Sequence, residues 1–259
     1  MHKAATNWPE FREAWDGLQN FMMTGLVDFG FDFPPLAEVV DQVRTDSASR
    51  ITRGDSQDQC KSDDIAESFR ALPIDVAMLE PFALAHFKLS CFDRPGGFLH
   101  GFRDRVLDAW QQTLTDSGFT WDRLFPILFI SGAGCWTGYH MDCSHVMAWQ
   151  VYGHKRFCGL LNPDRWAPDE IRRKPYGITR PAGLTDDDAL CYDMAPGDML
   201  WNKLLTPHWV NAGDDVAMSI NISHGGLRLN GCLAPFEEAL EAYRRDCPET
   251  APALVPGGY

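Results

Sequence analysis

The stretch Thr137-Gly138-Tyr139-His140-Met141-Asp142, together with His208 further along the chain, decides how this sequence is interpreted. Side chains two residues apart on an extended backbone point the same way, so His140 and Asp142 face one side and Met141 faces the other. Two imidazoles and one carboxylate on one face of a first-row metal leave positions open for further ligands. We therefore predict that His140, Asp142 and His208 bind one metal ion.

Apolar runs on both sides of this stretch predict the strands that present it. Residues 124–132 form an apolar, partly β-branched run closed by glycine, which is typical of a buried strand. Residues 147–163 predict two strands around a turn at Gly153-His154. Pro196-Gly197 predicts a turn into another strand, which leads to His208. The sequence thus predicts a β-rich core around the metal site.

The order of these motifs resembles the JmjC and cupin-like 2-oxoglutarate oxygenases, most closely the asparaginyl-hydroxylase-like branch. The resemblance covers residues 124–224. It consists of Thr137 before the first ligand, Lys155 after it, the Gln150…Gly153-x-Lys155…Pro163 pattern, the Pro196-Gly197-Asp198 turn, and Asn221 on the strand after His208. It implies a mainly β fold, with a double-stranded β-helix (cupin or jelly-roll) core and flanking α-helices.

The same resemblance implies an Fe(II)- and 2-oxoglutarate-dependent dioxygenase. Fe(II) would be held by the three predicted ligands, and 2-oxoglutarate and O2 would take the open positions. Thr137 and Lys155 would bind the distal carboxylate of the cosubstrate, and Asn221 would lie beside it. The physics agrees, because a buried dicarboxylate needs a cation and a hydroxyl donor.

The expected reaction is hydroxylation of an aliphatic C–H bond with release of succinate and CO2. The absence of a repeat or recognition module favours a small molecule, such as an amino acid or a natural-product intermediate. A protein side-chain hydroxylase of the same family is the alternative, and desaturation, cyclisation or demethylation would use the same residues. A metal-binding cupin that is not an oxygenase has no need for Thr137 and Lys155. Four aromatic residues are candidates for the apolar wall of the site or for ordinary core: Trp136, Tyr139, Trp149 and Trp201.

Composition limits the remaining possibilities. The chain has 259 residues, 45% of them hydrophobic, which predicts one sizeable core. We expect a single oxygenase domain over 1–259, with N-terminal helices and first strands in 1–123, the metal core in 124–224 and a C-terminal helix and tail in 225–259. The net charge of −13 argues against nucleic acid and against an anionic membrane surface as partners.

Eight cysteines occur without any Cys-x-x-Cys pair. Cys135, Cys143 and Cys158 lie in apolar, strand-like stretches, so we predict buried free thiols in a reducing compartment. No secretory signal pattern and no membrane-length apolar run is present, and the expected location is cytoplasmic.

Outside the core, helices are predicted over 7–23, 101–116 and 235–247, and the last could cap the barrel or form a homodimer seam. Residues 43–64 predict a polar loop or a lid, and residues 163–190 a charged insertion at the barrel mouth. Residues 78–89 predict a strand on which His86 and Lys88 face away from Phe87. For His86, Lys88, His145 and His224 an ordinary structural role is the default expectation.

Overall fold

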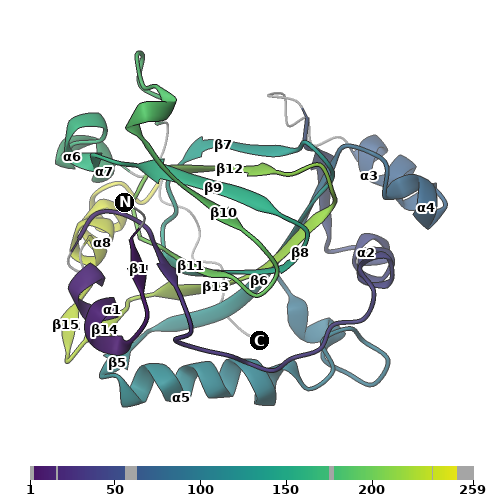
Figure 1. Ribbon diagram of the computed structural model, residues 1–259, viewed down its shortest axis with the longest axis horizontal. Helices are drawn as coiled ribbons and strands as arrows, with labels where there is room; N and C mark the ends of the chain where they lie inside the picture. The colour runs from purple at the N-terminus through teal and green to yellow at the C-terminus, as the bar shows by residue number, and fades with distance from the viewer. Residues whose placement is uncertain (1–2, 16, 56–62, 175–177, 235, 250–259) are drawn as a thin grey trace.

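A computed structural model describes residues 3–15, 17–55, 63–174, 178–234 and 236–249. Eight strands form its centre: β6 (Arg123–Ser131), β7 (Trp136–His140), β8 (His145–Tyr152), β9 (Lys155–Leu160), β10 (Ala189–Met194), β11 (Met199–Asn202), β12 (His208–Ala212) and β13 (Ala217–Gly225). They lie in two facing sheets, with β7, β12, β9 and β10 above the larger sheet in Figure 1.

The strand order identifies the fold. The larger sheet contains the order β11-β8-β13-β6, and the second sheet has the order β10-β9-β12-β7. All neighbours within these two sets are antiparallel. Apart from β9 to β10, each core strand is followed by one in the opposite sheet. This winding is a double-stranded β-helix, so the predicted fold class is confirmed.

The two faces of the larger sheet differ in character. On one face, Met147, Trp149 and Ile220 belong to the main hydrophobic core, which also contains Trp110 and Leu114 of α5 (Asp108–Asp116). Figure 1 shows α5 running along that side of the sheet, preceded by a π-helical turn, η2 (Arg103–Leu107). The alternating residues of β8 and β13, among them Ala148, Gln150 and Ser219, line a cavity on the other face. Strand periodicity therefore separates a packed outer face from an inner face with room for ligands.

The N-terminal prediction needs a correction. The helix predicted over 7–23 ends early, as α1 (Trp8–Trp15), and the chain returns as strand β2 (Phe21–Met23), which pairs with β11. The buried Lys203 ammonium binds the carbonyls of Ala14, Trp15 and Gly17, which stops the helix. Tertiary pairing thus overrides helical periodicity. The short β1 (Ala4–Ala5) completes this edge.

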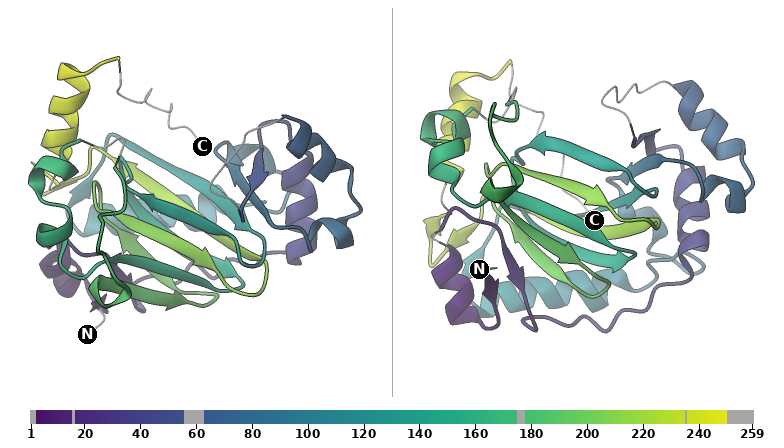
Figure 2. Two further views of the ribbon diagram at one scale, coloured as in Figure 1. Left: turned by 90° about the horizontal axis from the view of Figure 1, so that it is seen from above. Right: turned by 45° about the horizontal axis from the view of Figure 1, so that its top comes forward.

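At the opposite edge, two further strands extend the larger sheet beyond β6. They are β4 (Phe82–His86), which occupies the middle of the strand predicted over 78–89, and β3 (Arg50–Arg53), which pairs with β4. The prediction of a loop over 43–64 is therefore wrong for β3 and for the last turn of α2 (Leu36–Thr45). Residues 56–62 of that segment lie outside the described residues. Behind this edge lie α2, α3 (Asp63–Ala71) and α4 (Ile74–Ala77), as Figure 2 shows.

The other end of the barrel carries the remaining helices. The predicted insertion contains α6 (Pro163–Trp166), α7 (Asp169–Arg172) and the turn η3 (Asp186–Asp188). The predicted C-terminal helix is α8 (Glu237–Asp246), whose Leu240 packs against Met141, Leu204 and Leu205. A small sheet of β5 (Phe119–Thr120), β14 (Arg228–Leu229) and β15 (Cys232–Leu233) lies near α1, and the turn η1 (Leu89–Phe92) follows β4. The helix α8 thus covers one end of the barrel.

The cysteine prediction is wrong for one pair. Cys158 and Cys191 are direct cross-strand partners on β9 and β10, and they form a disulfide. Cys135 is a buried free thiol, as predicted, whereas Cys143 is only half-buried, and Cys60 lies outside the described residues. The disulfide was missed because it depends on the pairing of two strands 33 residues apart in sequence.

None of the helices within the described residues is long and apolar enough to cross a membrane.

Candidate metal and cosubstrate site

A cavity of about 330 Å³ lies between the two sheets and continues over β3 and β4. All six residues predicted for the site line it, namely Thr137, His140, Asp142, Lys155, His208 and Asn221. Other lining residues are Val146, Ala148 and Gln150 of β8, Asn202 of β11, and Ser219 of β13. The cavity is therefore lined by residues from all eight barrel strands and from the β7–β8 loop.

The three predicted metal ligands form a compact donor set. One donor atom from each of His140, Asp142 and His208 lies within 4.8 Å of the other two. His140 Nε2 is 3.8 Å from Asp142 Oδ1, and His208 Nε2 is 3.6 Å from Asp142 Oδ2. The histidines are direct cross-strand partners on β7 and β12, with ring centroids 4.1 Å apart. Two nitrogens and one oxygen in this arrangement suit a mononuclear first-row metal.

Backbone carbonyls hold both imidazoles in the form a metal needs. His140 Nδ1 is 2.7 Å from Gly138 O, and His208 Nδ1 is 3.0 Å from Thr206 O. Because a carbonyl can only accept, each Nδ1 carries the proton, and each Nε2, the nitrogen that faces Asp142, keeps its lone pair. The Nε2 of His208 has one long contact besides, at 3.3 Å from Asn202 Nδ2. Burial, with a smaller effect of His140, lowers the pKa of His208 to about 4. His208 is therefore neutral at physiological pH.

An irregularity in the β7–β12 pairing places Thr137 in the cavity. His208 is opposite His140, but Val210 is opposite Thr137, so β7 contains one extra residue between the two pairs. Residues three apart on a regular strand face opposite sides, whereas a β-bulge restores the same side. Thr137 and His140 both line the cavity for this reason.

Lys155 is a buried cation whose ion partner is missing from the described residues. Its Nζ donates to Ser219 Oγ at 3.2 Å and to Phe129 O at 3.4 Å, and no described carboxylate forms an ion pair with it. Burial lowers the pKa of Lys155 to about 8. A buried ammonium is costly without an anion. The site therefore suits a ligand carboxylate at this position.

Asn221 adds a second unsatisfied polar group to the same cavity. Its amide oxygen is buried and has no hydrogen-bond partner within the described part of the chain. Buried polar atoms of this kind are rare in native proteins and often mark a missing ligand. The orphaned oxygen is an acceptor, so it calls for a hydrogen-bond donor such as a bound water, while Lys155 is the group that fits a ligand carboxylate.

Sequence reasoning missed Asn202, the last residue of β11. Its Nδ2 donates to Asp142 Oδ2 at 2.7 Å and lies 3.3 Å from His208 Nε2, while its Oδ1 is buried without a partner. An amide that holds the free oxygen of a metal-binding carboxylate fixes the carboxylate orientation. A single polar residue closing the apolar run Met199–Trp201 is the sequence signal that could have revealed it.

His86, His145 and His224 lie outside the cavity. His224 accepts a hydrogen bond from Trp110 Nε1 at 2.8 Å, and His145 stacks on Trp15 with ring centroids 4.9 Å apart. His86 faces the opposite side of β4 from Phe87, which does line the cavity. Lys88 does not line it either. The structural reading expected for these side chains therefore stands.

None of the four aromatic residues considered for the apolar wall, Trp136, Tyr139, Trp149 and Trp201, lines the cavity. Trp149 and Trp201 belong instead to the main core on the outer face of the larger sheet. The aromatic lining comes instead from Phe87, Phe129 and Phe157, the last of which stacks on His208 at a centroid distance of 5.0 Å.

Asp46, His86 and Cys91 also place three possible donor atoms within 4.8 Å of one another. His86 Nδ1, however, accepts from the Lys88 backbone N–H at 3.1 Å, so the ring proton must be on Nε2. That nitrogen faces Asp46 Oδ1 at 3.1 Å and donates to it. The Nε2 lone pair is thus unavailable, and this cluster is a hydrogen-bonded structural group.

Fold and donor set together define a double-stranded β-helix with a candidate mononuclear metal centre. The sequence matches no protein-family model and no curated protein. Among solved structures, it is similar to YcfD, a ribosomal oxygenase from Escherichia coli, at 17% identity and a TM-score of 0.48. That alignment covers 100% of this chain and 64% of the YcfD chain, so this chain spans just under two thirds of that length. YcfD has also been solved in complex with cobalt and 2-oxoglutarate.

A second similarity is to the DMSP lyase DddQ from Ruegeria pomeroyi, at 15% identity over 45% of each chain and a TM-score of 0.28. A cupin superfamily protein from Desulfitobacterium hafniense aligns at 12% identity over 41% of this chain and 74% of its own, with a TM-score of 0.25. At such values the function has to be argued from the site itself.

Proposed function

We propose that this protein is an Fe(II)- and 2-oxoglutarate-dependent oxygenase that hydroxylates an aliphatic C–H bond of a small molecule. The observation that supports this most directly is the presence, in one cavity, of the open-sided donor set His140, Asp142 and His208 and of the buried Lys155. A metal-binding cupin of another kind would have no use for a buried cation at this position.

Each residue has a defined task in the proposed reaction. His140, Asp142 and His208 would hold Fe(II), which would supply the site for 2-oxoglutarate and O2. Lys155 pairs with the distal carboxylate of 2-oxoglutarate, supported by the Thr137 hydroxyl, and Asn221 hydrogen-bonds beside it. Phe157 packs on His208 and keeps bulk water from that side of the metal.

With iron and cosubstrate bound, the site supplies oxidation by O2 coupled to loss of CO2. One atom of O2 enters succinate and the other enters the product, so R–H, O2 and 2-oxoglutarate yield R–OH, succinate and CO2. The protein contributes positioning and exclusion. The cavity of about 330 Å³ lies within the range for small-molecule sites.

Anaerobic titration of the metal-free protein with Fe(II) and 2-oxoglutarate tests the proposal. We expect a weak visible charge-transfer band from the chelated keto acid in the wild type and no band in His208→Ala. Succinate release in air then provides the assay for substrate screening. Iron binding without the band would contradict the proposal and leave a metal-binding cupin of another kind.

A further inference from the structure

The cavity extends beyond the barrel, onto the two added strands. Arg50 and Thr52 of β3, with Ala83 and Ala85 of β4 and Phe87 just after it, line this part. They are alternate residues of their strands, so they lie on one face of the sheet. It is the same face on which β6 borders the metal site. The two alanines leave a shallow floor beside Phe87. This outer part adjoins the metal site and uses none of its six assigned residues.

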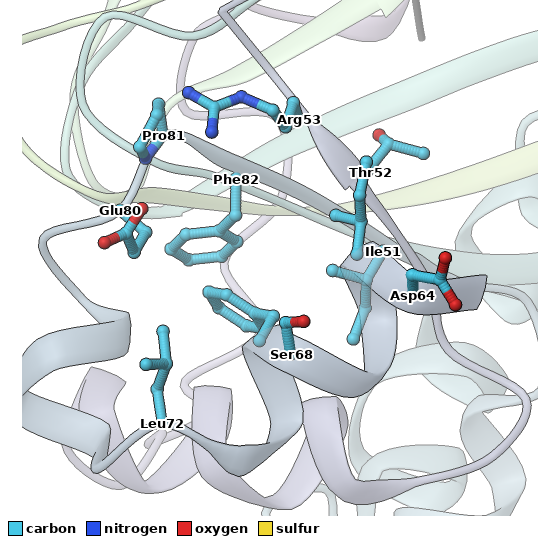
Figure 3. Close-up of a pocket in the computed structure, with 11 residues that line it drawn as sticks. Ile51, Thr52, Arg53, Asp64, Ser68, Leu72, Glu80, Pro81 and Phe82 are labelled. Carbon is cyan, nitrogen blue, oxygen red and sulfur yellow. The ribbon is translucent and has the colours of Figure 1, made fainter. Parts of the chain in front are cut away.

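The opposite face of the same strands has a different character. Ile51 and Arg53 line a separate pocket of about 350 Å³ between β3 and α3, together with Phe82 and Leu72 (Figure 3). Arg53 forms an ion pair with Asp55 at 2.8 Å. The two arginines of β3 thus face different pockets, and one of them already has a carboxylate.

Arg50 is the arginine without a carboxylate. Its guanidinium carbon lies 4.5 Å from the centre of the Phe87 ring, and within the described residues it forms no ion pair. Stacking on an aromatic ring holds the guanidinium plane while its N–H groups stay available. Phe87 in turn contacts Phe129, at a centroid distance of 6.2 Å, and Phe129 also lines the cavity.

Arg50 and the Lys155 ammonium lie over different strands of the larger sheet. Arg50 is opposite Ala85, which is opposite Phe129, whose carbonyl accepts from Lys155. Two interstrand steps separate β3 from β6, which corresponds to roughly 10 Å. The cavity therefore contains two separate cationic positions, in a protein whose net charge is −13.

The charges of the residues that line the cavity indicate the charge of the missing substrate. Its charged lining residues are Arg50, Asp142 and Lys155. With a divalent metal and dianionic 2-oxoglutarate in place, the charges of metal, Asp142, Lys155 and cosubstrate cancel. One positive charge, that of Arg50, remains beside the open part of the cavity. A guanidinium fork is matched by a carboxylate, which can accept two parallel hydrogen bonds.

We propose that Arg50, stacked on Phe87, is the substrate-recognition residue, and that the substrate is a small monocarboxylate whose chain lies over Ala83 and Ala85 toward the metal. This inference rests on the proposed function, because the charge balance assumes bound metal and 2-oxoglutarate.

Binding of matched probes to the full chain, loaded with Mn(II) and saturated with 2-oxoglutarate without O2, tests the proposal. The probes are hexanoate, 4-methylpentanoate and N-acetyl-L-leucine, each compared with its primary amide by calorimetry. We expect at least one carboxylate to bind about tenfold or more tightly than its amide, the effect of a charge-assisted hydrogen bond at a partly exposed site. Arg50→Gln should abolish this preference and Arg50→Lys should retain part of it. Arg53→Gln, on the same strand but facing the other pocket, is the matched control and should behave as the wild type.

Three results would overturn the inference: no carboxylate preference in the wild type, the same loss in Arg53→Gln as in Arg50→Gln, or weaker 2-oxoglutarate binding in Arg50→Gln. The last would assign Arg50 to the cosubstrate. Titration of 2-oxoglutarate into the Mn(II) protein comes first, because it distinguishes failure of the proposed function from failure of the Arg50 assignment. If 2-oxoglutarate does not bind, the proposed function fails and the charge balance fails with it. If it binds normally and the probes show no preference, only the assignment of Arg50 fails.

Discussion

Two pairs of histidines lie near each other in the same barrel but in different surroundings. His140 and His208 face the cavity beside a carboxylate, whereas His145 and His224 face the packed core. Burial lowers the pKa in both settings, to about 4 for His208 and to about 3 for His224. Low pKa therefore does not distinguish a metal ligand from a structural histidine. The difference is an Nε2 lone pair that opens on a cavity instead of accepting from Trp110.

Removal of the Asp142 carboxylate should reveal the largest difference in metal affinity between changes at the cavity site and changes at the core histidines. Asp142→Ala deletes a metal ligand, and loss of a ligand should exceed the 10–100-fold cost that is typical of its outer-shell partners. We expect Fe(II) affinity to fall by more than about 100-fold and turnover to vanish. The control is His145→Phe, which alters the core histidine next to the site and should keep wild-type metal affinity. Competition with a chelator measures both, and tight metal binding by Asp142→Ala would mean that the donor set is misassigned.

Lys155→Ala should affect the cosubstrate and spare the metal. Breaking a buried ion pair typically costs about 3–5 kcal/mol, so 2-oxoglutarate affinity should fall by at least about 100-fold. Fe(II) affinity should stay within a few-fold of the wild type, since Lys155 contacts neither histidine. Titration of the charge-transfer band measures the first quantity and chelator competition the second. Unchanged cosubstrate affinity would remove the proposed role of Lys155.

The same lysine gives the expected pH dependence. Its pKa without ligand is lowered to about 8, and an anion binds the protonated form. The affinity for 2-oxoglutarate should therefore be level below pH 8 and fall by about tenfold per pH unit above it. A wild-type affinity that stays level up to pH 9.5 would contradict this assignment.

Asn202→Ala is expected to have an intermediate effect. Without the amide, the Asp142 carboxylate loses the hydrogen bond that orients it, and metal affinity should fall by about 10–100-fold. Addition of excess Fe(II) should restore most of the activity, because all three ligands remain. Activity that stays low at saturating iron would point instead to a direct role of Asn202 in the reaction.

Substitution of a core histidine should lower the stability of the protein without changing its metal affinity. His224→Phe leaves the buried Trp110 N–H without its acceptor, which costs about 1–3 kcal/mol. Denaturant unfolding should detect this loss, while Fe(II) affinity stays at the wild-type value. A large loss of metal affinity in a folded His224→Phe protein would mean that the two pairs are coupled.

The sequence could predict the features that depend on neighbouring residues, but not those that depend on contacts between distant parts of the chain. Strands β6, β8, β9 and β11 were predictable because each has a local apolar pattern and a turn beside it. His140 and Asp142 were found from a spacing of two, and Lys155 and Asn221 from a resemblance. By contrast, β2 and β3 are short strands that exist through pairing with β11 and β4, and local pattern cannot reveal such pairing. The disulfide of Cys158 and the placement of Arg50 depend on the same non-local contacts.

The direct pairing of His140 with His208 has a consequence for folding experiments. These residues are joined by the hydrogen-bonded ladder of β7 and β12, and a one-residue slip of that ladder would turn His140 to the opposite face. A chain with misaligned strands would keep its β content but lose the donor set. Metal retention after refolding is therefore a test of correct strand alignment, and it is more specific than circular dichroism for judging recombinant preparations.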